Sequence, residues 1–226
     1  MKYAVTLLAF TPNPEDLICV AARRCRSNLP TLDIDTSNPE KVIRQIIEAG
    51  HLSVLEHVNF TFAIDGISRV CLSQLTRHRL ASFTVQSQRF SEVDDLVEPR
   101  GLFSDEDVKT TFGKYKSALD SGVEKEDARY YLPQAVKTSL VLTMNARELL
   151  HFFMLRCCLK AQWEIRRLAD DMLKLIKPVA PNIFKHAGAF CQQNGYCRES
   201  APCGKMDVPH KHFLFELYRF WLENRR

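Results

Sequence analysis

The sequence predicts an α+β fold with a β-sheet and long helices. Short β-leaning segments alternate with amphipathic helical segments, but without the regular rhythm of parallel crossover units. Only eight glycines occur in 226 residues, and no Gly-x-Gly-x-x-Gly or Gly-Lys-Ser/Thr motif is present, which argues against a Rossmann or P-loop domain. The length and a hydrophobic content of 46% suit one sizeable core. We therefore expect a single domain over residues 1–226, with a C-terminal extension from about residue 187.

The N-terminal half is predicted to contain two strands and three helices. Residues 2–10 form an apolar run without a basic leading segment, so we interpret them as a strand rather than a signal peptide. A helix is expected over residues 14–26, with a proline in its first turn. A second helix starts after Asn38 and is stopped by Gly50. The remaining elements expected here are a strand over residues 58–64 and a short helix over 68–76.

The C-terminal half is predicted to be mainly helical. Acidic residues in a first turn indicate that a helix opens at residues 104–107. A β-leaning segment covers 138–143. Residues 146–177 lack Gly and Pro, so we expect one long helix there, and a last amphipathic helix over about 212–224.

The charge balance does not indicate a nucleic-acid binder. Thirty-one Lys and Arg face 27 Asp and Glu, a net charge of +4, with acids interspersed among the bases. A dedicated nucleic-acid binder usually shows a stronger excess and a basic stripe. No window approaches the roughly 18 uninterrupted apolar residues of a membrane span. We expect a cytoplasmic protein with no membrane or nucleic-acid partner, and an anionic small molecule fits the charge balance equally well.

The eight cysteines are expected to be free thiols, since the chain shows no secretory signal. Cys191, Cys197 and Cys203 are the set that could suggest a metal, because they recur at six-residue intervals with His210 and His212 beyond them. Structural zinc usually uses a tighter Cys-x2-Cys knuckle. The spacing therefore favours ordinary thiols, and we predict no metal.

The densest chemical signal is the segment from Gln74 to Phe90. Arg77, His78, Arg79 and Arg89 occur here with no acid among them. Neighbouring cations repel one another, so they need either solvent or an anion. A solvated basic turn is the simpler interpretation. The apolar residues on either side, however, suggest that the segment is partly buried. Burying an arginine without a negatively charged partner is costly, so a site that binds an anion is the alternative interpretation.

These residues resemble the signature of the flavin-dependent thymidylate synthases, which is Arg77-His78-Arg79, seven residues, then Ser87. Three further segments resemble family motifs in the same order, namely His51–His57, Ala128–Pro133 and Asn145–Arg166. The resemblance covers roughly residues 50 to 185. Four ordered motifs are far more specific than an isolated Arg-His-Arg.

The resemblance implies methylation of dUMP to dTMP, in dTMP biosynthesis. Methylenetetrahydrofolate would supply the carbon and reduced FAD the hydride, with NADPH reducing the flavin. It also implies a homotetramer with sites shared between subunits. The thymidylate synthases that use a cysteine nucleophile carry it in a Pro-Cys-His context. The only Pro-Cys here is Pro202-Cys203-Gly204, so we expect no covalent cysteine chemistry.

The resemblance assigns two sets of site residues, with Arg156 as the catalytic one. The FAD set comprises Ser53, Arg77, His78, Arg79, Val85, Asn145, Ala146, Arg147 and His151. The dUMP set comprises Gln74, Leu75, Thr76, Arg77, Val85, Gln86, Ser87, Gln88, Arg89, Arg129 and Arg156.

Arg156 shares a predicted helix face with Leu149, Phe152 and Phe153. A snorkelling or ion-paired arginine would explain this placement. The functional alternative is a cation against the uracil edge, which would stabilise negative charge developing on the pyrimidine. Arg147 and His151 lie roughly opposite on the same helix, so one helix would serve two pockets if sites lie between subunits.

The sequence also departs from the family pattern. Thr84-Val85 stands where Asn-Glu is common, Phe90 where Tyr is common, and His151 where Asn is frequent. Val85 can contact a ligand through its backbone but not through a polar side chain. The neighbouring Gln86 is the candidate to take over the role of the family's glutamate. Glu56 either orients a ligand or pairs with an arginine. Two other functions stay open: a nucleic-acid-binding module built on the Arg-His-Arg patch, and a family member that binds FAD without turnover.

Overall fold

The computed structural model describes residues 2–99, 101–209 and 221. The chain divides into two compact units, each made of two separate stretches. The first unit is Met1–Ala9 with Thr61–Thr143, and the second is Phe10–Phe60 with Met144–Arg226. A sheet and helices together confirm the predicted α+β class. The expectation of one domain over the whole chain stays a prediction.

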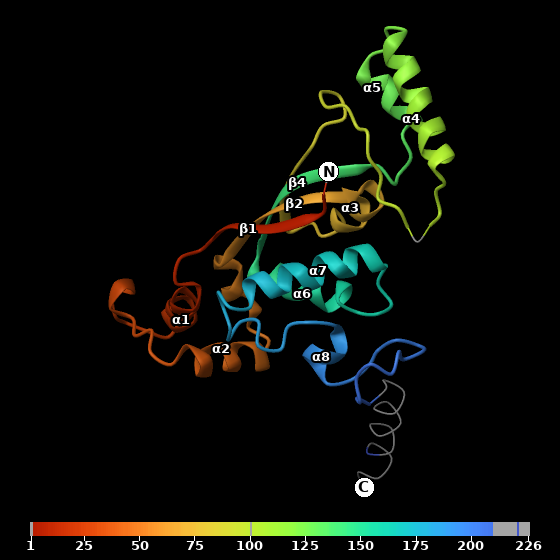
Figure 1. The fold of residues 1–226 in the computed structure, drawn as a ribbon. Helices are drawn as coiled ribbons and strands as arrows, with labels where there is room; N and C mark the ends of the chain where they lie inside the picture. The colour runs from red at the N-terminus through yellow and green to blue at the C-terminus, as the bar shows by residue number, and fades with distance from the viewer. Residues whose placement is uncertain (1, 100, 210–220, 222–226) are drawn as a thin grey trace. The chain divides into compact units, whose positions relative to one another are not determined.

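The sheet has four strands in the order β1-β2-β4-β3 (Figure 1). Their bounds are β1 Ala4–Phe10, β2 Asn59–Ser68, β3 Ala81–Val85 and β4 Lys137–Asn145. The pairing of β2 with β4 is antiparallel. The Thr61 and Thr143 hydroxyls lie 2.9 Å apart, whereas the Arg69 N–H donates to the Val136 carbonyl at 3.2 Å. The strands predicted at 2–10, 58–64 and 138–143 are therefore confirmed, and β3 is an additional strand.

In strand β2 the side chains alternate most clearly between fully buried and less buried positions. Phe60, Phe62 and Ile64 are fully buried on alternate positions, which explains why the pattern predicted a strand. The strand continues beyond the predicted end through Gly66, which has φ +68°. A Cβ there would lie 2.9 Å from the backbone of Lys2 and Tyr3. Only glycine allows β1 to approach this closely.

The helices of the first unit are α3 (Arg69–Leu75), α4 (Asp105–Asp120) and α5 (Lys125–Ala128), followed by the short 3-10 helix η3 (Arg129–Tyr131). Ser68 caps α3 by accepting the Cys71 N–H at 3.0 Å. Ser104 and Asp107 form a capping box that starts α4, as its acidic first turn predicted. Both helices begin within one residue of the predicted positions.

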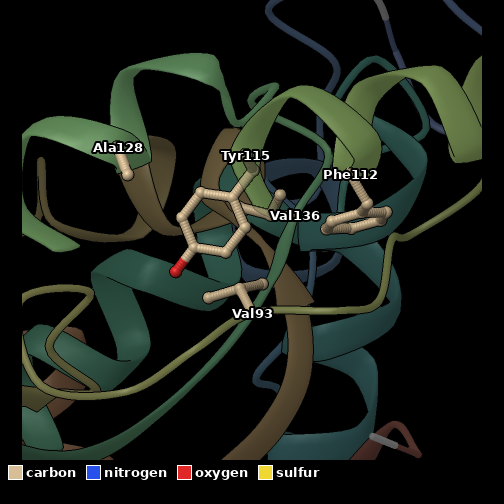
Figure 2. Close-up of a cluster of buried hydrophobic side chains, with 5 residues drawn as sticks. All are labelled: Val93, Phe112, Tyr115, Ala128 and Val136. Carbon is tan, nitrogen blue, oxygen red and sulfur yellow. The ribbon is translucent and has the colours of Figure 1, made fainter. Parts of the chain in front are cut away.

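A small core holds α4 and α5 in the first unit (Figure 2). The Tyr115 ring is 2% exposed and packs with Phe112 from the same helix. Ala128 comes from α5, and Val93 and Val136 come from the two flanking segments. This cluster joins residues that are more than forty positions apart, so it fixes the segment that carries Arg129.

The second unit is helical. Its helices are α1 (Pro14–Arg24), α2 (Pro39–Glu48), α6 (Ala146–Arg156), α7 (Trp163–Ile176) and α8 (Phe190–Asn194), with 3-10 helices η1 (Thr31–Asp33) and η2 (Leu52–His57). Phe60, Phe153 and Phe184 are fully buried and meet edge to face, with ring centroids 5.5 and 6.1 Å apart. This aromatic core supports α6.

The prediction of one long helix over 146–177 is wrong. The chain forms α6 and α7 instead, separated by residues 157–162. The physical reason is a cap rather than a Gly or Pro. The Gln162 side chain accepts the N–H groups of Glu164 and Ile165 at 3.0 and 3.1 Å, which starts a new helix.

Two other predictions concern the C-terminal helix and membrane-spanning segments. The helix predicted over 212–224 lies outside the described residues. Within the described stretches, none of the helices combines the length and the apolar character that crossing a bilayer requires.

Candidate active-site residues

The Arg-His-Arg turn follows α3 directly. Cys71, Leu72 and Leu75 bury one face of this helix, which fixes the position of its last turn. The His78 side chain is 4% exposed, whereas Arg77 and Arg79 on either side are exposed. The turn is therefore anchored by the histidine and presents the two arginines outward. The sequence had indicated such partial burial.

Strand β3 leads into a tight turn at Ser87. The Gln86 N–H donates to the Ser139 carbonyl of β4 at 2.8 Å. The Ser87 carbonyl accepts the N–H groups of Phe90 and Ser91 at 3.3 and 3.0 Å, and its hydroxyl accepts the Arg89 N–H at 3.2 Å. Ser87 and Arg89 are thus held in one turn at the end of the sheet.

Arg89 and Arg129 are brought together by Glu126. The Arg89 Nε lies 2.6 Å from the Glu126 carboxylate, and the Arg129 Nε donates to the Glu126 backbone carbonyl at 2.8 Å. The two arginines are forty positions apart in the sequence, and the family resemblance assigns both to dUMP. The structure places them in one region, while their role toward dUMP stays a prediction. Their shared partner, Glu126, was not identified by sequence reasoning.

Arg69 is a third arginine of this region that sequence reasoning missed. It is half-buried at the first position of α3. Burial lowers the pKa of its guanidinium, and the positive charge of Arg129 lowers it further. A bound anion would relieve the repulsion between these two guanidinium groups. The available signal was an arginine followed directly by the apolar residues Val70, Cys71 and Leu72.

In the second unit, Arg147 stands in the first turn of α6. Asn145 caps this helix, because its side chain accepts the Glu148 N–H at 2.9 Å. The Arg147 Nη1 lies 2.5 Å from the Glu56 carboxylate of η2, so Glu56 has the arginine partner that was one of its two predicted alternatives. Exposed Ser53 belongs to the same 3-10 helix, and His151 is exposed one turn along α6. The two elements η2 and α6 contact each other, and together with the cap of α6 they carry Ser53, Glu56, Arg147 and Asn145.

Arg156 is the last residue of α6 and is half-buried. It lines a cavity of about 290 Å³ in the second unit. Leu149, Phe152 and Phe153 are buried along the same helix, as its apolar face predicted.

The remaining predicted residues differ in what they can offer. The side chains of Leu75 and Ala146 are fully buried, so these two residues can serve a ligand only through backbone or packing. The Thr76 hydroxyl donates to the Leu72 carbonyl at 3.1 Å. The half-buried members are Gln74, Val85, Gln86 and Gln88.

The two predicted sets divide differently between the units. The dUMP set lies in the first unit apart from Arg156. The FAD set divides, with Arg77, His78, Arg79 and Val85 in the first unit, and Ser53, Asn145, Ala146, Arg147 and His151 in the second.

Comparisons with known proteins identify relatives over most of the chain. A family model described as "Thymidylate synthase complementing protein" matches residues 6–182. The flavin-dependent thymidylate synthase of Geobacter sulfurreducens is 43% identical over 218 residues, covering 89% of this chain and 94% of that protein. The flavin-dependent thymidylate synthase of Pyrococcus furiosus is 41% identical over 219 residues, covering 86% and 89%. Among solved structures, a UMP/dUMP methylase, PolB from Streptomyces cacaoi bound with 5-Br dUMP, is similar with a TM-score of 0.68. Its identity is 25%, over 81% of this chain and 93% of that chain.

Proposed function

The chain belongs to the flavin-dependent thymidylate synthase family, and on this premise we propose that it methylates dUMP to dTMP. Methylenetetrahydrofolate is the proposed carbon donor, and NADPH is the proposed reductant of the flavin. The observation that carries the proposal is the arginine cluster of the first unit, because it matches the charge of a nucleotide phosphate.

Arg89, Arg129 and Ser87 are the proposed ligands of the dUMP phosphate, with Arg69 as a further cation. A phosphate carries close to two negative charges near neutral pH. Of these three guanidinium groups only that of Arg89 forms an ion pair with a described residue, so the cluster has positive charge to spare. Guanidinium forks bind phosphate through paired N–H donors. The Glu126 carboxylate, 2.6 Å from Arg89, supports the view that an oxyanion fits this position.

The uracil ring is proposed to be held by Arg156 and by amide side chains. Gln74, Gln86 and Gln88 offer both donors and acceptors for the base and sugar. The Arg156 guanidinium would stabilise negative charge that develops on the pyrimidine as its C5 becomes nucleophilic. Leu75, Thr76 and Val85 contribute backbone and packing.

The residues assigned to FAD fit an anionic dinucleotide. Arg77 and Arg79 are exposed, and neither forms an ion pair with another described residue. The N-terminus of α6, an eleven-residue helix, carries Arg147, whose guanidinium and backbone N–H together favour a phosphate. The neighbouring Ala146 and Glu148 N–H groups already donate to the Val58 carbonyl and to the Asn145 side chain. Asn145 fixes that terminus, and Ser53 and His151 add polar groups. When bound, FAD supplies the hydride that completes the methyl group.

Gln86 is the proposed substitute for the carboxylate that the family commonly carries at the position of Val85. Its backbone N–H is fixed to Ser139 at 2.8 Å, so its half-buried side chain starts from a defined point. A glutamine can donate and accept but carries no charge. The change should therefore alter affinity more than the reaction itself.

We further propose a homotetramer in which each pocket takes residues from more than one chain. Arg147 and His151 lie nearly opposite Arg156 on α6, so one pocket cannot easily use both faces of a single copy. Mixed oligomers of Arg147→Ala and Arg156→Ala test this at an FAD concentration low enough to leave Arg147→Ala without flavin, so that neither variant alone turns over. Recovery of turnover supports shared pockets. Verified mixed oligomers with no activity above either parent contradict sharing and leave the enzyme assignment intact.

The absorption spectrum of the purified protein tests the function directly. We expect yellow protein that releases FAD on heating, bleaches with NADPH and forms dTMP when dUMP and methylenetetrahydrofolate are added. Colourless protein that takes up no added FAD would contradict the proposal. Flavin binding without dTMP formation would identify a family member that has lost turnover.

A further inference from the structure

The cavity at the end of α6 is bounded partly by residues that lie beyond the segment matched by the family model. Arg156 lines this cavity from α6, whereas Phe190, Arg198 and Glu199 line it from the C-terminal side. The family model matches residues 6–182, and the resemblance assigns none of these three C-terminal residues to a ligand. Ligand pockets usually hold about 300–1,000 Å³. A cavity of about 290 Å³ therefore suits a single ring, such as a pyrimidine, rather than a whole nucleotide.

Side-chain contacts hold the C-terminal segment against α6. The Gln193 side chain donates to the Leu150 carbonyl of α6 at 3.0 Å. The Asn194 Nδ2 lies 3.9 Å from the Met154 sulfur of the same helix. Gly195 then ends α8 in the left-handed conformation, φ 73°, which turns the chain back toward the cavity. This wall of the cavity is thus attached to α6 itself.

Aromatic contacts fix the position of Arg198. Its guanidinium carbon lies 4.5 Å from the centroid of the Phe190 ring, a distance at which a cation is attracted to the face of an aromatic ring. The Phe190 ring in turn meets the Tyr196 ring edge to face, with centroids 5.0 Å apart. Arg198 and the adjacent Glu199 therefore reach the cavity from a backbone segment that is held in place.

The hydrogen-bonding groups of the cavity are several donors and one strong acceptor. The side chains of Arg156, Lys160 and Arg198 carry only donors, and the Glu199 carboxylate carries only acceptors. The other lining side chains are apolar or are thiols, which hydrogen-bond weakly: Met154, Leu155, Cys158, Ala161, Phe190, Cys191 and Cys197. Among the lining residues in the described part of the chain, Glu199 is therefore the only strong side-chain acceptor.

The polar edge of uracil has the complementary pattern. It presents a carbonyl oxygen, the N3–H and a second carbonyl oxygen, which are acceptor, donor and acceptor. Guanidinium groups donate to such oxygens, and a carboxylate accepts the N–H. Cytosine carries an amino group and an unprotonated N3 instead, so its N3 lone pair would face the carboxylate with no proton between them. A pocket lined in this way accepts uracil and rejects cytosine.

Building on the proposed methylation of dUMP, we propose that Glu199 and Arg198 determine the specificity of this site for uracil. Glu199 accepts the uracil N3–H, and Arg198 donates to the ring oxygen O2. Arg156 donates to O4 and keeps the catalytic role proposed above. The C-terminal segment thus selects the base on which Arg156 acts.

Binding of dUMP and dCMP to the flavin-loaded protein tests this selection, because no turnover occurs without the folate. Isothermal titration measures both dissociation constants. The wild type should bind dUMP at least about 100-fold more tightly than dCMP. Glu199→Ala should weaken dUMP binding by about 10–100-fold and change dCMP binding by less than about threefold, so that the preference falls. Asp207→Ala is the matched control, since Asp207 is an exposed acid of the same segment that does not line the cavity.

Arg198→Ala separates the two proposed contacts. Uracil and cytosine share O2, so this variant should weaken dUMP and dCMP binding equally, by about tenfold, and leave the preference unchanged. Lys205→Ala, which removes an exposed cation of the same segment, is its control and should bind both nucleotides as the wild type does. Binding of dUMP by Arg198→Ala within about threefold of wild type overturns the role of Arg198.

Three results on Glu199 or on the wild type overturn the proposal. They are a wild type that binds dCMP as tightly as dUMP, an unchanged preference in Glu199→Ala that retains its flavin, and an equal loss of preference in Asp207→Ala. If Glu199→Ala fails to fold, Glu199→Gln decides in its place, because its amide also donates to the cytosine N3 and should lower the preference at least about fivefold. A flavin-loaded wild type that binds no dUMP overturns the proposed function itself, whereas an unchanged preference in the variants leaves that function intact.

Discussion

Two arginine–glutamate pairs occur in the proposed ligand-binding regions, one in each unit. Arg89 pairs with Glu126 in the first unit, and Arg147 pairs with Glu56 in the second. All four side chains are between 43% and 57% exposed. Ion pairs at such positions contribute about 0.2–1 kcal/mol, so an incoming phosphate can replace the carboxylate at small cost.

The pairs differ in what surrounds them. Arg89 lies in a turn with Arg129 and Arg69 nearby, so several guanidinium groups can share one doubly charged anion. Arg147 stands at the N-terminus of α6, where its guanidinium and its own backbone N–H can both bind an anion, while the Ala146 and Glu148 N–H groups already have partners. Phosphate binding in the first region therefore depends on side chains, whereas in the second region it depends partly on the backbone. Mutations should therefore act more strongly in the first.

The largest effect is expected for Arg129→Ala. Losing a charge-assisted phosphate contact and leaving its neighbours unbalanced should cost about 3–4 kcal/mol, or about 10²–10³-fold in kcat/KM for dUMP. Steady-state kinetics with saturating cofactors measure it, while bound flavin should not change. Arg44→Ala, an exposed arginine of α2, is the matched control. Activity within about threefold of wild type in Arg129→Ala would refute the phosphate assignment.

A smaller effect is expected for Arg147→Ala. The backbone N–H of residue 147 and the helix N-terminus remain, so the affinity for FAD should fall by about 10–100-fold, equivalent to 1.4–2.8 kcal/mol. Fluorescence titration of the apoprotein with FAD measures this, and dUMP affinity at saturating FAD should stay nearly constant. Arg167→Ala on α7 controls for loss of a surface cation. A loss as large as that of Arg129→Ala would remove the distinction between the two regions.

A modest effect of opposite sign is expected for Glu126→Gln. Removing the competing carboxylate frees the Arg89 fork, so KM for dUMP should fall by up to about fivefold while kcat changes little. Glu92→Gln, which removes a neighbouring pair with Lys125 at 3.2 Å, is the control. If KM instead rises more than tenfold, Glu126 positions Arg89 for the substrate and does not merely occupy its place.

The smallest effect is expected for Asp95→Asn, which removes an ion pair that lies outside the proposed ligand-binding residues. The Lys137 Nζ lies 2.7 Å from Asp95. Partial burial pushes the pKa of Asp95 up, but the hydrogen bond and charge of Lys137 outweigh it, so this pKa lies below its usual value. A lowered carboxyl pKa stabilises the folded state above the unfolded value of about 3.9, and this stability is lost as pH falls through the folded pKa.

Denaturant unfolding at several pH values checks this last prediction. Asp95→Asn should lower the free energy of unfolding by up to about 1 kcal/mol near neutral pH, and the difference should vanish below about pH 3. Activity should not change. A difference that persists in strong acid would show that packing, rather than the charge, is lost.

The fold was predictable where local signals agreed with burial. The alternation in 58–64, the proline near the start of α1 and the capping residues of α4 each predicted an element that is present. The break between α6 and α7 was not predictable from breakers, because a glutamine side chain makes it. Strand β3 was missed because its residues lie beside a motif that was interpreted only for its chemistry.

The candidate site was predictable where a residue belongs to a motif. Arg89 and Arg129 are in the same region, as the resemblance implied. Arg69 and Glu126 could not be found this way, because their roles depend on contacts between segments about sixty positions apart or on a backbone carbonyl.

The interleaved path of the chain has a consequence during synthesis. The second unit begins at Phe10, but its core also needs Phe153 and Phe184. Residues 61–143, which belong to the other unit, must leave the ribosome first, and at about 5–20 residues per second they take roughly 4–17 s. During that interval η2 has no α6 to pack against, and the Phe60 ring has no Phe184. The nascent chain is therefore a natural client for chaperones that bind hydrophobic segments co-translationally.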